Sequence, residues 1–242
     1  MSNMFLTKEF AEKWDEHQTS REDVLRTRIM NPIILKEIGS LGGKSVLEVG
    51  CGNGFFIKHL ISLNPKHIAS FDISKHFIEL TRKRYPQVEL KQGDVMKRIP
   101  FSDNQFDCVT CYSVINDIQR ISKAVSEMRR VAKKGGYIHI IIVHPLYNLF
   151  INDPKAKDDP LIKRLSKYLK VEAILVDTIP GYPKFKVYRR PLSDYINEFI
   201  KNNLEIEKMV EVPVNQKAAK ANNKYLDRLG VPVFAYFKLK KN

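Results

Sequence analysis

Hydrophobic side chains near the start of the chain recur every three or four positions among charged ones, as Phe10 and Trp14 do and as Ile34 and Ile38 do again. That period predicts amphipathic helices. A group of glycines beginning at Gly39 ends this section. We interpret residues 1–40 as an N-terminal helical cap.

The next hundred residues alternate short apolar runs with helical patterns. Such alternation predicts a parallel sheet with helices on both faces. Ligands of these sheets bind at the carboxyl ends of the strands. Lys133, Lys134, Gly135 and Gly136 are expected to form a helix C-cap and turn. The expected strands are 44–49, 68–71, 88–91, 106–112 and 137–143, and the expected helices are 55–63, 74–85 and 118–132.

The regular alternation stops at His144. Residues 144–190 are rich in proline, lysine and aromatic side chains, so we interpret them as an insertion that covers the site. A hairpin is expected there, with strands at 171–178 and 184–189. The remainder, 191–242, predicts a helix over 192–201 and strands at about 204–212 and 232–240. All 242 residues fit one domain, with its core at 44–143.

Composition narrows the protein class. No apolar run approaches the roughly 20 residues that span a bilayer, and charged residues from Lys8 onward interrupt the N-terminus too early for an apolar signal region. We therefore expect a cytoplasmic protein without a membrane partner, either a monomer or a homodimer. The three cysteines are odd in number, and Cys108 and Cys111 lie in an apolar run, which favours buried thiols over a metal site.

The formal net charge of +14 favours encounters with anions, nucleic acid among them. The lysines are spread along the chain, however, and the dense clusters are short, such as Arg82-Lys83-Arg84. No basic motif interleaved with aromatics follows the RNA-binding pattern. Nucleic acid is therefore an unlikely partner, although the charge alone does not exclude it.

The first expected strand runs into a turn with the spacing Glu48-x-Gly50-x-Gly52-x-Gly54. Glycines let the backbone bend sharply and let a ligand approach closely. A dinucleotide-binding domain also places a glycine-rich turn here, but with the spacing G-x-G-x-x-G. The carboxylate of Glu48 would repel a pyrophosphate, whereas it suits the cationic amino-acid end of S-adenosylmethionine (SAM).

Two further acids end the next two strands. Asp72 can accept hydrogen bonds from both ribose hydroxyls, and Asp94 can accept one from an adenine amino group. Each acid alone is compatible with an ordinary cap or turn. Three carboxylates at the ends of three consecutive strands indicate SAM as the cofactor.

These motifs, together with Phe106-Asp107-Cys108-Val109 and Gly135-Gly136, resemble those of class I SAM-dependent methyltransferases of the type 11 group, including bacterial enzymes for small molecules and natural products. The resemblance implies a Rossmann-like seven-stranded sheet, mostly parallel with an antiparallel last strand, and S-adenosylhomocysteine as product. It implies that Val95 lies at the adenine and Tyr112 at the methionine portion. The expected cofactor-binding residues are Trp14, Glu48, Gly50, Cys51, Gly52, Gly54, Phe55, Asp72, Ile73, Asp94, Val95, Tyr112 and Ser113.

The acceptor is expected to be a small molecule that is methylated on nitrogen or oxygen. Methyl transfer from a sulfonium is an in-line displacement, so catalytic groups can be few. His144, at the end of the fifth strand, is our candidate general base. Tyr147, Tyr188 and Arg190 are candidate substrate-binding residues. The alternatives are an RNA or peptide methyltransferase and a non-catalytic SAM-binding module.

Overall fold

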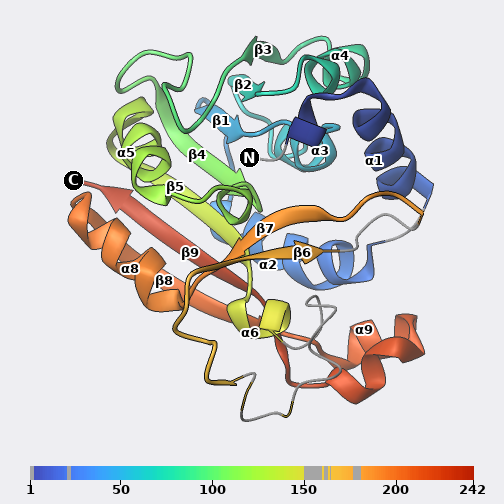
Figure 1. The fold of residues 1–242 in the computed structure, drawn as a ribbon. Coiled ribbons are helices and arrows are strands. Elements are labelled where there is room, and N and C mark those ends of the chain that lie inside the picture. The colour runs from blue at the N-terminus through green and yellow to red at the C-terminus, as the bar shows by residue number, and fades with distance from the viewer. Residues whose placement is uncertain (1–2, 21–22, 150–159, 161–162, 164, 177–180) are drawn as a thin grey trace.

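The computed structural model describes residues 3–20, 23–149, 160, 163, 165–176 and 181–242. Within them one twisted sheet has seven strands in the order β3-β2-β1-β4-β5-β9-β8 (Figure 1). The strand bounds are β1 Ser45–Val49, β2 His67–Asp72, β3 Glu89–Gln92, β4 Phe106–Tyr112, β5 Ala132–Val143, β8 Leu204–Pro213 and β9 Pro232–Lys241.

The first five strands pair in parallel, and β9 runs antiparallel between β5 and β8. Short apolar strands that are joined by helices pair in parallel, because each helical crossover returns the chain to the same edge of the sheet. The predicted Rossmann-like sheet with an antiparallel last strand is confirmed. Its carboxyl edge gathers the loops that follow β1, β2, β3 and β4.

Helices cover both faces of the sheet. Alternate strand residues point to opposite sides, so Val46 packs with one core cluster and Leu47 with the other. Figure 1 shows α5 and α8 along one face and α1, α2 and α3 along the other. Their bounds are α1 Lys8–Ser20, α2 Asn31–Ile38, α3 Phe55–Ile61, α4 Lys75–Arg84, α5 Ile121–Val131 and α8 Leu192–Lys201.

The segment around Gly135 and Gly136 differs from the prediction. Helix α5 has its C-cap at Ala132, and the glycines lie inside β5, where the register with β4 shifts between Phe106 and Cys108. A Cβ at Gly136 would meet the Lys133 carbonyl oxygen at 2.9 Å. The glycine therefore permits close backbone approach at an irregular strand pair, and it does not cap a helix.

The N-terminal region folds as the predicted helical cap, preceded by the 3-10 helix η1 (Asn3–Leu6) and interrupted by the π-helix η2 (Leu25–Met30). The predicted hairpin is also present as β6 (Glu172–Val176) and β7 (Phe185–Arg189). Its expected end at 177–178 and turn residue 180 lie outside the described residues. The hairpin crosses the carboxyl edge of the sheet, next to α1 (Figure 1).

Aromatic rings join the cap to this hairpin. The Phe10 ring stacks on Trp14 with centroids 5.7 Å apart, and Phe185 of the hairpin contacts Phe5, Phe10 and Trp14 within 6.0 Å. Edge-to-face aromatic pairs of this kind contribute more to the stability of the fold than their buried area alone would give. The two segments therefore form one cover over the carboxyl edge.

Short elements that the periodicity did not predict complete the chain. They are η3 (Ile115–Asp117), α6 (Pro145–Tyr147), α9 (Gln216–Ala221) and η6 (Asn223–Arg228). All three cysteines are buried free thiols, as predicted. Across the described ranges, no helix combines the length and the apolar character that crossing a membrane requires.

Candidate functional site

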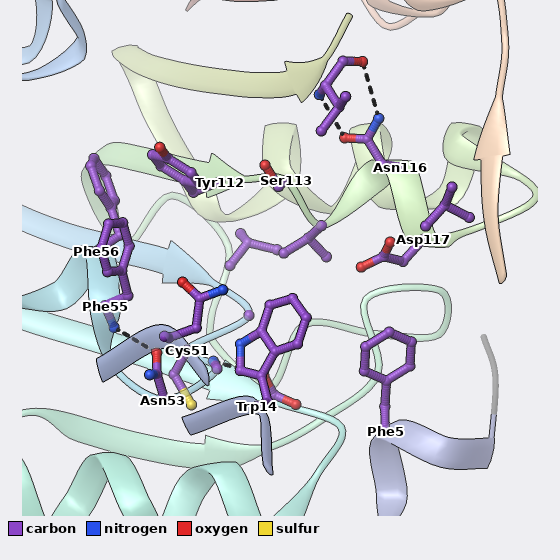
Figure 2. A pocket seen from close by; sticks show the side chains of 18 of the residues that line it. Phe5, Trp14, Cys51, Asn53, Phe55, Phe56, Tyr112, Ser113, Asn116 and Asp117 are labelled. Carbon is purple, nitrogen blue, oxygen red and sulfur yellow. Dashed lines mark hydrogen bonds between the residues drawn. The ribbon is translucent and has the colours of Figure 1, made fainter. Parts of the chain in front are cut away.

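A cavity of about 450 Å³ opens at the carboxyl edge of the sheet (Figure 2). That volume is within the range of small-molecule sites. Its walls come from the loops after β1 to β4, from the N-terminal cap and from the β6–β7 hairpin. The predicted cofactor residues that line it are Trp14, Glu48, Gly50, Cys51, Gly52, Phe55, Asp72, Ile73, Val95, Tyr112 and Ser113.

The glycine-rich turn forms one end of the cavity. Gly50 has φ of 79°, and a Cβ there would lie 2.6 Å from the Val114 side chain, so both the backbone angle and the packing require glycine. Gly54 packs against Tyr85 and does not line the cavity. The backbone of this turn is therefore exposed to a ligand at close range.

Asp72, at the end of β2, holds the turn in place. Its carboxylate accepts hydrogen bonds from the backbone amides of Gly52 at 3.0 Å and Ser74 at 2.9 Å. Burial raises the pKa of Asp72 to about 6, although these amides act to lower it. The carboxylate is thus ionised at neutral pH and still has lone pairs for ligand hydroxyls.

Glu48 lies deep in the same wall and is 2% exposed. Its carboxylate accepts a short hydrogen bond from the Thr110 hydroxyl. Burial raises the pKa of Glu48 well above its usual range despite this bond. A cationic ligand at this point would favour the ionised form, which fits the ammonium of an amino-acid group.

Ser113 follows β4 in a strained conformation. Its φ is 61°, a left-handed value that non-glycine residues rarely adopt. The Ser113 backbone amide donates to the Ile141 carbonyl at 2.9 Å, while the buried hydroxyl has no partner among the described residues. A hydroxyl in a cavity wall without a partner suits a polar ligand atom.

Asp94 does not line the cavity, although Gly93 and Val95 on either side of it do. The Asp94 carboxylate accepts a hydrogen bond from the Met96 amide at 2.9 Å, which shapes the turn after β3. Its role toward adenine stays a prediction.

An ion pair fastens the N-terminal cap beside the glycine turn. The guanidinium of Arg84, on α4, donates to both carboxylate oxygens of Asp15, on α1, at 2.6 Å each. Arg84 also donates to the Asn53 carbonyl, and the Asn53 amide donates to Asp15. Asp15 thereby fixes its neighbour Trp14, whose indole projects into the cavity (Figure 2).

The other end of the cavity is mostly apolar. Its lining there comes from β5 and β9 and includes Val143, Val233 and Phe234. The hairpin and the N-terminal cap extend this apolar lining toward Trp14 with Phe5, Leu25, Val176, Phe185 and Val187. Tyr147 lies there too, as predicted, and receives a hydrogen bond from Arg228 at 3.4 Å. This end suits an apolar molecule more than a charged one.

Arg26 is a cavity residue that the sequence analysis did not single out. It comes from the π-helix η2, and its guanidinium lies 5.8 Å from the Phe55 ring and 5.6 Å from the Tyr112 ring. Asp23 pairs with it at 3.3 Å. A π-helix is often found at functional sites, but no periodicity signal predicts it.

His144 does not occupy the place predicted for a general base. It is 1% exposed and does not line the cavity. Its Nδ1 accepts a hydrogen bond from the Leu146 amide, so its Nε2 carries the proton that faces Glu211 at 2.8 Å. With both ring nitrogens in use, His144 caps α6 and has no free lone pair for an acceptor's proton.

Tyr188 and Arg190 also lie outside the cavity lining. The Arg190 guanidinium is buried and donates to the backbone carbonyls of Ile115, Ile118 and Gln119 at 2.8 to 3.0 Å. Arg190 thus holds the 3-10 helix η3 that follows β4. Its role in binding the acceptor stays a prediction.

Comparison with known proteins agrees with this geometry. Residues 47–140 match the family model described as a methyltransferase domain. A SAM-dependent methyltransferase from Mesorhizobium loti has the same fold, with a TM-score of 0.67 at 14% identity over 87% of this chain and 96% of that one. Together these matches support a class I SAM-dependent methyltransferase.

Curated methyltransferases from bacteria match part of the chain. A demethylmenaquinone methyltransferase from Renibacterium salmoninarum is 29% identical over 126 residues, which is 52% of each protein. A phthiotriol/phenolphthiotriol dimycocerosates methyltransferase from Mycobacterium ulcerans is 26% identical over 174 residues, 64% of each. The chain thus spans about half to two thirds of the length of these relatives.

The family model and the solved structures imply SAM as the cofactor, and the cavity fits it. The ionisable Glu48, the unpartnered Ser113 hydroxyl and the Asp72 carboxylate offer acceptors and donors along one wall. The described residues contain no cluster of His, Cys, Asp or Glu that would hold a metal ion.

Proposed function

We propose that this protein transfers the methyl group of SAM to a nitrogen or oxygen atom of an apolar small molecule. The observation that carries the proposal is the division of one cavity into two ends. Polar groups after β1 to β3 suit the donor, while valine and aromatic side chains from β5, β9 and the hairpin suit an apolar acceptor.

The relatives support the same class of acceptor, because they are quinone and lipid methyltransferases. The chain's own residues bind and align the two reactants. Asp72 and Glu48 hold the donor, Trp14 and the hairpin cover the site, and the apolar wall excludes water from the reacting atoms. Bound SAM supplies an electrophilic methyl group, so alignment accounts for much of the rate enhancement.

The proposal is tested with deuteromethyl-labelled SAM. The protein is incubated with 2-naphthol and 2-naphthylamine as defined probes, with an organic-phase extract of bacterial metabolites, and with bulk tRNA. Label in an organic-soluble product, together with S-adenosylhomocysteine, is the expected result. Label in tRNA instead would favour the RNA methyltransferase alternative. Tight SAM binding without product from any fraction would favour a non-catalytic SAM-binding module.

A further inference from the structure

Asp117 is a fourth carboxylate in the wall of the same cavity. It belongs to η3, the 3-10 helix directly after β4, and it lines the cavity. In Figure 2 its carboxylate points into the open space that Trp14 and Phe5 border. Asp117 lies five positions beyond Tyr112, so the rule that acids directly end the strands does not identify it in the sequence.

Four carboxylates line this cavity, and three of them are engaged. Asp72 accepts from two backbone amides, Glu48 from a threonine hydroxyl, and Asp23 from Arg26. The side chain of Asp117 has no hydrogen bond or ion pair within the part of the chain that the structure describes. Unpartnered polar groups in a cavity wall call for a ligand or a chemical role.

The sheet order places Asp117 between the two ends of the cavity. Strand β4 lies between β1, whose loop forms the donor end, and β5, whose last residue Val143 belongs to the apolar end. The loop after β4 therefore borders both ends of the cavity. A carboxylate there is placed to meet an acceptor atom that lies between the two ends.

The backbone that carries this carboxylate is fixed from two sides. Arg190 donates to the carbonyls of Ile115 and Ile118, and the Asn116 side chain exchanges two hydrogen bonds with the backbone of Val143. These contacts hold the backbone at Asp117 in place, and they leave the two carboxylate oxygens of Asp117 free. Such support is what a catalytic group requires.

We propose that Asp117 is the general base that takes the proton from an acceptor hydroxyl during methyl transfer. This inference rests on the proposed function and narrows it to an acceptor with an ionisable O–H group, such as a phenol or an enol. The acceptor's O–H bond breaks and its proton moves to an Asp117 carboxylate oxygen. The acceptor oxygen forms the new bond to the methyl carbon, the S–CH₃ bond breaks, and the sulfur keeps the bonding pair.

The charges around Asp117 suit this role. Burial raises its pKa to about 7, while Arg26 acts to lower it and Asp72 acts to raise it. Tyr195 and the thiol of Cys111 also interact with its charge. A base is most effective when its pKa lies near the operating pH, and only the ionised carboxylate accepts a proton. Turnover is therefore expected to rise with pH through about 7.

The matched variants are Asp117→Asn, which keeps the shape but cannot accept a proton, and Asp227→Asn, whose carboxylate is 78% exposed on η6. Asp117→Asn is expected to lower kcat on the hydroxyl acceptor at least 100-fold, which is within the usual range for general-base catalysis. It is also expected to abolish the rise of kcat with pH. SAM affinity by calorimetry is expected to change less than threefold. Asp227→Asn is expected to have the same kcat and the same SAM affinity as the parent.

A second measurement separates this inference from the proposed function. Carboxyl carbons are followed by ¹³C NMR against pH in the SAM-free protein, with Asp117→Asn used to assign the signal. A titration near pH 7 is expected. A midpoint below pH 5, or an Asp117→Asn variant with parental kcat, would overturn the role of Asp117 even if methyl transfer occurs. If no fraction is methylated, the proposed function fails, and the base role fails with it whatever the titration shows.

Discussion

The guanidinium of Arg84 binds the carboxylate of Asp15 through two hydrogen bonds of 2.6 Å, joining α4 of the sheet domain to α1 of the cap. Arg84 is 34% and Asp15 16% exposed, so water screens this pair only in part. Burial acts to raise the pKa of Asp15, but the hydrogen bonds from Arg84 and Asn53 outweigh it and the pKa is lowered. The pair is thus a bidentate contact between two segments that are distant in the sequence.

Loss of this contact is expected to weaken SAM binding. Asp15→Asn removes the charge and one of the two strong bonds, which frees the segment that carries Trp14. We expect the Kd for SAM to rise about tenfold, equal to about 1.4 kcal/mol. Calorimetry measures it. Glu16→Gln is the matched control, because Glu16 forms only an exposed pair with Lys13 on the same helix. Equal affinities in the two variants would show that the cap does not depend on the pair.

The ionisation of Asp72 predicts how SAM affinity changes with pH. The pKa of this carboxyl is raised to about 6, and the ionised form is the one that accepts ribose hydroxyls. Affinity is therefore constant above pH 7 and falls below pH 6, with Kd about tenfold higher at pH 5 than at pH 8. Calorimetric titrations at several pH values, with protein integrity checked at each, test this.

Asp72→Asn supplies the control for that pH dependence. Its affinity is expected to be at least tenfold weaker than that of the parent at pH 8, because the charge-assisted hydrogen bonds are lost. It is also expected to lose the part of the pH dependence that belongs to Asp72, leaving any contribution from Glu48. Parental affinity and parental pH dependence in this variant would exclude the ribose contact.

Much of the fold follows from local signals in the sequence. The strands β1, β2 and β4 are short runs rich in apolar residues, and β1, β2 and β3 end at a glycine or an acid where the chain leaves the sheet. The α4 start at Ser74 was predicted, and its side chain caps the Phe77 amide. These signals depend on period and turn chemistry, which are local properties.

The functional residues that were missed depend on tertiary contacts instead. Arg26 reaches the cavity from a π-helix, whose extra residue per turn leaves no distinct pattern. Asp117 reaches it from a 3-10 helix that Arg190 holds from more than 70 residues away in the sequence. His144 has the sequence position of a base, but its Nε2–H donates to Glu211 on β8. The rule that ligands bind at the carboxyl ends of parallel strands identifies the correct edge of the sheet. It does not say which side chains at that edge point into the cavity.

His144→Ala is expected to affect stability more than catalysis. The variant leaves the Leu146 amide without its cap and Glu211 without its partner, a loss of about 1–3 kcal/mol in the free energy of unfolding. Urea denaturation measures the loss, and kcat at saturating SAM is expected to stay within threefold of the parent. Glu211→Gln keeps an acceptor for Nε2–H and is expected to lose less stability. A large fall in kcat at unchanged stability would return His144 to the mechanism.

Arg190 gives the last prediction, which joins the stability of the fold to the placement of Asp117. Arg190→Met leaves three backbone carbonyls, two of them buried, without this donor, and we expect the free energy of unfolding to fall by about 2–4 kcal/mol. Arg190→Lys keeps the charge but has no planar fork to reach all three carbonyls, so it is expected to restore only part of that loss. Arg98→Met, at a side chain 70% exposed, is the control for loss of a cation. Because η3 carries the base, the lysine variant, measured where it is fully folded, is also expected to lower kcat while SAM affinity stays unchanged. A lysine variant that regains full stability and full kcat would show that charge alone suffices at this position.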